Sequence, residues 1–144
     1  MIKLCMSRVP EKYWINHLTY KCDTCGSTFE DWIPNGYDIV KLEAKGNGEV
    51  RWLPTYGTGG YIDLMTKLIP NHNKNDEITM EKSKTFIRKL ERYSEKGKLG
   101  CGFELSRRIS NCINCDSKDL KTINEEVLVN PELEWLKISC DLIK

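Results

Sequence analysis

The sequence contains few histidines and no long apolar run. His17 and His72 are its only histidines, so acid–base catalysis would depend on them or on carboxylates. No HExxH, GxSxG or Walker-type pattern occurs. No apolar stretch approaches the roughly 18 residues that a membrane-spanning helix requires. We therefore expect a protein that is neither an enzyme nor embedded in a membrane.

A secretion signal is also missing from the first residues. Residues 1–10 lack the apolar stretch and the small-residue cleavage site of a signal peptide, so we expect a cytoplasmic protein. The chain has seven cysteines, which cannot all pair within it. In a reducing compartment, paired CxxC spacings are more often metal sites than disulfides. The cysteines therefore favour a metal.

The composition is that of a soluble globular protein, with 40% hydrophobic and 30% charged residues in a chain of 144. This length favours one domain, residues 1–144. The formal charge is +1, and four thiolates around Zn²⁺ would bring it to about −1. A nearly neutral chain is not typical of a nucleic-acid-binding protein. The charge is uneven, because residues 79–108 carry 9 basic and 4 acidic side chains.

Four cysteines form two CxxC pairs: Cys22, Cys25, Cys112 and Cys115. Each pair offers two sulfurs to one ion, and four thiolates complete the tetrahedral shell of one structural zinc. A catalytic zinc would need an open position. The alternative is a redox-active CxxC, but that motif typically opens a helix. Neither pair here is followed by a helical pattern, so we predict shared ligation of zinc.

The segment Tyr20-Lys-Cys-Asp-Thr-Cys-Gly26 resembles the zinc-ribbon family, in which a strand, a CxxCG knuckle and a second strand pack beside another CxxC knuckle. The second pair, Cys112-Ile-Asn-Cys115-Asp-Ser, matches without the glycine. The resemblance implies knuckles at 20–26 and 110–117. Its departure is the spacer of 86 residues between the pairs, which is much longer than in common Cys₄ patterns. Residues 39–98 would then be an insertion.

Residue patterns predict a mixture of strands and helices. Residues 18–32 read as strand, knuckle and strand, and 39–43 and 49–53 as a hairpin. Helical spacing predicts helices from 61 to Pro70 and over 79–96. The second helix would bury a stripe formed by Phe86, Ile87, Leu90 and Tyr93, and it would end at Gly97 and Gly100. Short strands are expected at 103–105 and 120–123.

The C-terminal residues 131–143 are compatible with two structures. Asn130, Pro131 and Glu132 are typical of a helix start, whereas Leu136, Ile138, Cys140 and Leu142 alternate as in a strand. We favour the helix. The predicted fold is α+β: a zinc ribbon formed from both ends of the chain, with a β-hairpin and two to three helices.

Other reactive side chains have structural interpretations. Cys5, Cys101 and Cys140 are expected to be small buried or half-buried residues rather than ligands or nucleophiles. We expect His17, just before the first ribbon strand, to have a structural role. We expect His72, in a polar loop, to be solvated. No catalytic residue is predicted.

Two groups of residues are candidates for binding a partner. Trp52, Tyr56 and Tyr61 flank a glycine-rich loop, 57–60, and could form an exposed aromatic surface. The basic helix contributes Lys84, Arg88 and Arg92, with Arg107 and Arg108 downstream, although a solvated helix face would also explain these charges. The favoured function is binding another protein, as an inhibitor or immunity protein. The alternative is nucleic-acid binding through helix 82–96.

Overall fold

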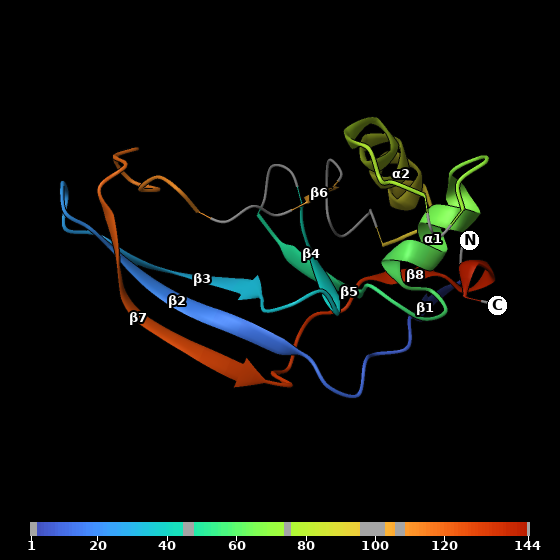
Figure 1. The fold of residues 1–144 in the computed structure, drawn as a ribbon, viewed down its shortest axis with the longest axis horizontal. Helices are drawn as coiled ribbons and strands as arrows, with labels where there is room; N and C mark the ends of the chain where they lie inside the picture. The colour runs from blue at the N-terminus through green and yellow to red at the C-terminus, as the bar shows by residue number, and fades with distance from the viewer. Residues whose placement is uncertain (1–2, 45–47, 74–75, 96–102, 106–108, 144) are drawn as a thin grey trace. The chain divides into compact units, whose positions relative to one another are not determined.

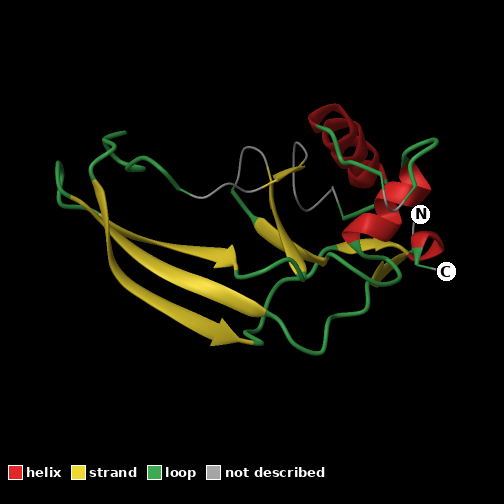
Figure 2. Cartoon of the chain, viewed as in Figure 1, coloured by secondary structure: helices red, strands yellow, loops and turns green. Residues whose placement is uncertain are grey.

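The computed structural model describes residues 3–44, 48–73, 76–95, 103–105 and 109–143. The protein has an α+β fold, as predicted, and its elements appear in Figures 1 and 2. The chain divides into two compact units, residues 1–11, 37–106 and 133–144 in the first and residues 12–36 and 107–132 in the second. Whether these units act as one domain stays a prediction.

The first unit combines two small sheets with two helices. Its elements are β1 (Leu4–Met6), β4 (Ile39–Ala44), β5 (Val50–Pro54), α1 (Tyr61–Leu68), α2 (Met80–Arg92), β6 (Phe103–Leu105), β8 (Lys137–Ser139) and the 3₁₀ turn η1 (Cys140–Leu142). One sheet has the order β5-β4-β6 and the other pairs β1 with β8. No helix in the described segments is long and apolar enough to cross a membrane.

The core of the first unit lies between its helices and strands. Phe86 and Leu90 of α2 are fully buried and belong to one cluster with Leu64 and Met65 of α1. Tyr61 packs edge-on against Phe86, with 4.8 Å between ring centroids. The apolar stripe predicted for α2 is confirmed at Phe86, Ile87 and Leu90, which are all buried.

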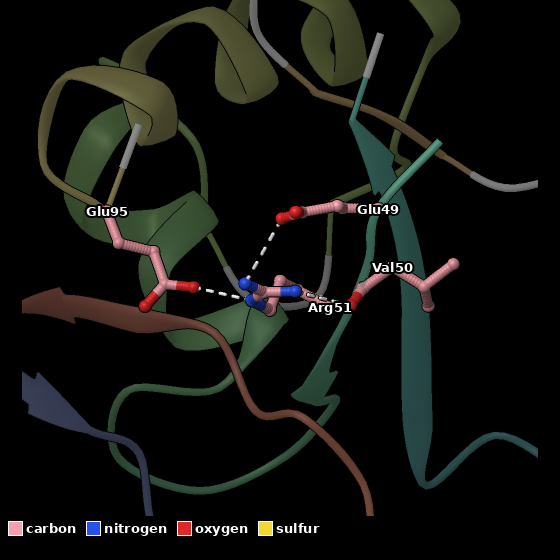
Figure 3. Close-up of polar contacts among 4 residues, drawn as sticks. All are labelled: Glu49, Val50, Arg51 and Glu95. Carbon is pink, nitrogen blue, oxygen red and sulfur yellow. Dashed lines mark hydrogen bonds and ion pairs between the residues drawn. The ribbon is translucent and has the colours of Figure 1, made fainter. Parts of the chain in front are cut away.

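A buried ion pair joins the segment after α2 to strand β5 (Figure 3). The Nε–H of Arg51 donates to Oε1 of Glu95 at 2.6 Å, and the Glu95 side chain is only 4% exposed. Arg51 also contacts Glu49 at 3.3 Å, but that carboxylate is 46% exposed. Arg51 therefore has one buried and one solvated acidic partner.

We expect replacement of Glu95 by alanine to destabilise the first unit by about 3 kcal/mol, because the largely buried guanidinium of Arg51 would lose the carboxylate that pairs with it. Urea unfolding checks this value. Glu49→Ala is the matched control and should cost less than about 1 kcal/mol, since exposed ion pairs contribute little. Equal losses in the two variants would show that burial of Glu95 is irrelevant.

The second unit is a three-stranded antiparallel sheet. Its strands are β2 (Trp14–Cys22), β3 (Thr28–Pro34) and β7 (Leu120–Val129), in the order β3-β2-β7 (Figure 1). Leu18 of the central strand lies opposite Asp31 of β3 and Glu125 of β7. The predicted strand, knuckle and strand are confirmed. Strand β7 continues six residues beyond the predicted 120–123, because it pairs with β2 along its whole length.

The predicted C-terminal helix over 131–143 is wrong. Lys137–Ser139 forms strand β8, in which Ile138 pairs with Cys5 of β1. Leu136 and Ile138 are both buried, as the alternation of apolar residues in a strand predicts. The helix-start residues lie before it, and Asn130 instead adopts a positive φ of 48°.

Helix α2 ends earlier than predicted. It stops at Arg92, and Tyr93 is 42% exposed rather than part of the core. The following residues pair with β8, since the N–H of Ser139 donates to the carbonyl of Tyr93 at 2.6 Å and that of Glu95 to Lys137 at 3.2 Å. Strand-like pairing therefore replaces the last predicted turn. Lys96, Gly97 and Gly100 lie outside the described residues.

Cys5 and Cys140 form a disulfide, which corrects the expectation of two separate half-buried thiols. Their Cα atoms are 5.0 Å apart. The pairing of β1 with β8 places Cys5 opposite Ile138, two residues before Cys140, which begins the 3₁₀ turn. The bond thus joins two segments that are 135 residues apart in sequence.

Candidate metal centre

The first knuckle is a tight turn between β2 and β3. The N–H of Gly26 donates to the carbonyl of Cys22 at 2.8 Å, and the N–H of Cys22 donates to the carbonyl of Ser27 at 2.9 Å. Gly26 has a φ of +77°, in the left-handed region that glycine adopts without steric cost. This turn folds the chain back so that Cys22 and Cys25 present their sulfurs to the same point.

The second knuckle repeats the same hydrogen bonds. The N–H of Asp116 donates to the carbonyl of Cys112 at 2.9 Å, and that of Cys112 to Ser117 at 2.8 Å. Asp116 has a φ of +60°, so it occupies the position that Gly26 holds in the first knuckle. Asp is one of the few residues that tolerate this conformation, and its carboxylate accepts from Asn111 at 3.0 Å. The missing glycine therefore does not change the turn.

The four cysteine sulfurs lie at mutual distances that suit one metal ion. Cys22 and Cys115 are 3.6 Å apart, as are Cys25 and Cys112, and all four sulfurs lie within 4.8 Å of one another. Zinc–sulfur bonds of about 2.3 Å in a tetrahedron separate the sulfurs by about 3.8 Å. The chain thus brings together the four ligands predicted from the sequence, and they could hold a metal ion.

Polar contacts fix the two knuckles to each other. The hydroxyls of Thr24 and Ser117 are 2.8 Å apart, and the side-chain amide of Asn114 donates to Ser27 at 2.7 Å. The N–H of Asp23 donates to the carbonyl of Asp119 at 2.9 Å. These bonds hold the two pairs of sulfurs in register from both sides.

The pKa values of Cys25 and Cys115 shift in opposite directions. The side-chain hydrogen bond between Cys25 and Ser27 is the main reason that the pKa of Cys25 is lowered to about 6. The backbone N–H of Ser117 lowers the pKa of Cys115, but burial and the three neighbouring sulfurs outweigh it and raise it to about 12. The neighbouring sulfurs therefore oppose ionisation of Cys115. A divalent cation would supply the charge that four thiolates require.

We expect Gly26→Ala to lower the stability of the second unit by about 1–2 kcal/mol, the usual cost of a left-handed residue other than glycine. A methyl group at this position would meet nothing within 4 Å, so the cost is conformational rather than steric. Thermal unfolding of the metal-loaded protein measures it. Asp116→Gly is the control, and it should not lower the midpoint as Gly26→Ala does. If Asp116→Gly lowers the midpoint as much as Gly26→Ala does, the two positions are not conformationally equivalent.

The aromatic surface proposed from the sequence is only partly exposed. Trp52 and Tyr61 are buried in the first unit, so their expected exposure is wrong. Trp52 forms a bridge with Trp135, and Tyr61 packs on Phe86. Tyr56 is 57% exposed. The sequence alone could not distinguish the exposed Tyr56 from the buried Trp52 and Tyr61, because their burial depends on how the hairpin meets the helices.

The basic candidates differ in what the structure describes. Lys84, Arg88 and Arg92 are all exposed on α2. None of the three forms an ion pair with any residue in the described part of the chain. Arg107, Arg108 and Cys101 lie outside the described residues.

Both histidines have partners that the sequence did not indicate. His72 is buried, not solvated, and its Nδ1 lies 3.2 Å from Nζ of Lys82. His17 lies within β2, three residues after its start, rather than before it. Its partners are glutamates on the two neighbouring strands. The alternating pattern of β2 could have placed His17 on a face, but not these partners, which depend on strand register.

Comparisons with known proteins leave the site without a named relative. No protein-family model, curated protein or solved structure matches this chain. The assignment of the four cysteines therefore rests on their geometry and chemistry.

Proposed function

We propose that the metal is zinc and that its role is structural. The shell consists of four sulfurs within 4.8 Å of one another, supplied by two knuckles with matching backbone hydrogen bonds. Soft thiolate ligands in a tetrahedron favour zinc, and four protein ligands leave no position for a substrate or an activated water. The knuckles and three strands together would form a zinc ribbon. Function then lies on the surfaces around the metal.

We further propose that the protein is a non-catalytic partner of another protein, of the inhibitor or immunity type. The supporting observation is the surface of the second unit. That unit carries 6 basic and 8 acidic residues, a formal charge of −2, which zinc with four thiolates would bring to −4. Its exposed apolar side chains include Ile113, Ile123, Val127 and Val129. Acidic charge with exposed apolar groups suits a basic protein surface and disfavours phosphates.

A different surface supports nucleic-acid binding as a second candidate. Lys84, Arg88 and Arg92 follow each other at four-residue intervals, so they form one row along the exposed face of α2. Three cations in a row, none of them in an ion pair within the described segments, can contact successive phosphates. Because only three charges are involved, we expect binding to be weak and sharply dependent on salt.

Affinity capture on the metal-loaded protein, with and without nuclease, separates the two functions. Protein binding predicts a stoichiometric partner that survives nuclease and is lost in a Val127→Lys, Val129→Lys variant. Its control, Lys84→Gln with Arg88→Gln and Arg92→Gln, should retain the partner. Nucleic-acid binding predicts the reverse pattern, with loss after nuclease. Capture of nucleic acid alone would overturn the first proposal.

A further inference from the structure

His17 connects all three strands of the second unit's sheet. Its Nδ1 lies 2.9 Å from Oε1 of Glu126 on β7, and its Nε2 lies 3.0 Å from Oε1 of Glu30 on β3. The imidazole also stacks on Trp32 of β3, with ring centroids 4.8 Å apart and planes 7° from parallel. One side chain of the central strand thus contacts both outer strands.

The two contacts determine which form of the imidazole fits. Ionised glutamates only accept hydrogen bonds, and a neutral imidazole has a single N–H to donate. Only the protonated ring, with two N–H groups, can donate to Glu30 and Glu126 together. Accordingly, the hydrogen bond with Glu126 and then that with Glu30 raise the pKa of His17 against the opposing effect of burial.

The surroundings of His17 define what else can titrate there. Glu30 faces it from β3 and Glu126 faces it from β7. The uncharged neighbours on the same face include Trp32 on β3 and Ile15 and Thr19 on β2. On β7, Asn124 and Leu128 flank Glu126 on this face. Lys21 lies a further step away on β2 and contributes no ion pair among the residues that the structure describes.

We propose that His17 is a proton-controlled clamp that holds the outer strands β3 and β7 on the central strand β2. These strands lead out of the two knuckles, since β3 begins at Thr28 and β7 at Leu120. Protonated His17 ties both strands, whereas neutral His17 can tie only one. The device makes the sheet that carries the metal ligands tighter in mildly acidic solution and looser in alkaline solution.

The sign of the effect follows from the raised pKa of His17 in the folded protein. The clamp contributes fully below the unfolded pKa of about 6.5, and its contribution disappears as the pH rises through the higher folded pKa. Loss of metal on acidification works in the opposite direction, because protons compete for thiolates. The clamp is therefore measured as a difference between variants at each pH.

The first test is an NMR titration of the His17 ring in the zinc-loaded protein. Glu126→Gln and Glu30→Gln should each lower the pKa of His17 by about one unit. Glu125→Gln is the matched control, because Glu125 lies opposite Leu18 and not on the face of His17. His72, in the other unit, should give the same resonances in every variant. A His17 pKa that is unchanged by both glutamine variants would overturn the clamp.

The second test is amide hydrogen exchange of β7, corrected for intrinsic rates, at pH 6 and pH 9. Protection in the wild type should fall about tenfold more over this interval than in His17→Gln, which corresponds to about one pKa unit. Parallel behaviour of the two proteins would contradict the proposal. If His17→Gln does not fold, the same comparison is made with the double variant Glu30→Gln, Glu126→Gln.

Discussion

Removal of the metal by a chelator is expected to unfold the unit formed by residues 12–36 and 107–132. The two knuckles lie at opposite ends of an 86-residue spacer, and closing such a loop costs about 4 kcal/mol. Apparent zinc binding in small zinc-finger peptides contributes roughly 10–16 kcal/mol, as much as the whole stability of an average domain. Without the ion, four adjacent sulfurs would also lose the charge that holds them together. We therefore expect this to be the largest effect on stability.

Heteronuclear NMR spectra with and without chelator measure this loss residue by residue. Amide resonances of β2, β3 and β7 should collapse to unfolded positions and return when Zn²⁺ is restored. Cys112→Ser should show the same collapse without chelator, since it removes one of the two buried ligands. Ser117→Ala is a control that alters the same knuckle without removing a ligand. Unchanged spectra after complete metal removal would contradict the expectation.

Loss of the Cys5–Cys140 disulfide is expected to have the second largest effect, about 4–5 kcal/mol. The bond closes a loop of more than 100 residues, for which the chain-entropy model gives a stabilisation of this size. Few native contacts would remain between the two terminal segments, because β1 and β8 have three residues each. Without the bond, both terminal segments would depend on this short pairing and on the burial of Ile138 and Leu136.

Urea unfolding of the double variant Cys5→Ala, Cys140→Ala, compared with the wild type, gives the size of this effect. This design avoids thiol reductants that bind zinc. Alkylation of the denatured protein supplies an independent check, since two more cysteines should react after reduction than before it. Equal numbers of reactive thiols before and after reduction would show that the bond is absent.

The two cysteine turns could be predicted from sequence because the information for each turn is local. Each CxxC pair sits in a turn whose hydrogen bonds involve residues no more than five positions apart, such as Cys22 and Ser27. The strands around the first knuckle were predictable for the same reason. The equivalence of Asp116 and Gly26 was not, since sequence did not show that an aspartate would adopt the left-handed conformation there.

The features that sequence analysis missed depend on contacts between distant residues. The C-terminal strand forms because Ile138 pairs with Cys5, more than 130 residues earlier. The same pairing brings Cys140 to Cys5, and the end of α2 is set by β8 as well. The burial of Trp52 and the partners of His17 likewise follow from strand register. Local helix signals at Pro131 could not compete with these long-range pairings.

The most direct test of the central claim is native mass spectrometry of the purified protein together with elemental analysis. We predict one zinc ion per chain, retained under mild conditions and released when the protein is denatured in acid. Changing Cys22 or Cys112 to serine should remove it, whereas changing Cys5 and Cys140 to alanine should leave it bound. A wild-type protein that carries no metal after exposure to Zn²⁺, with all four sulfurs open to alkylation, would contradict the assignment.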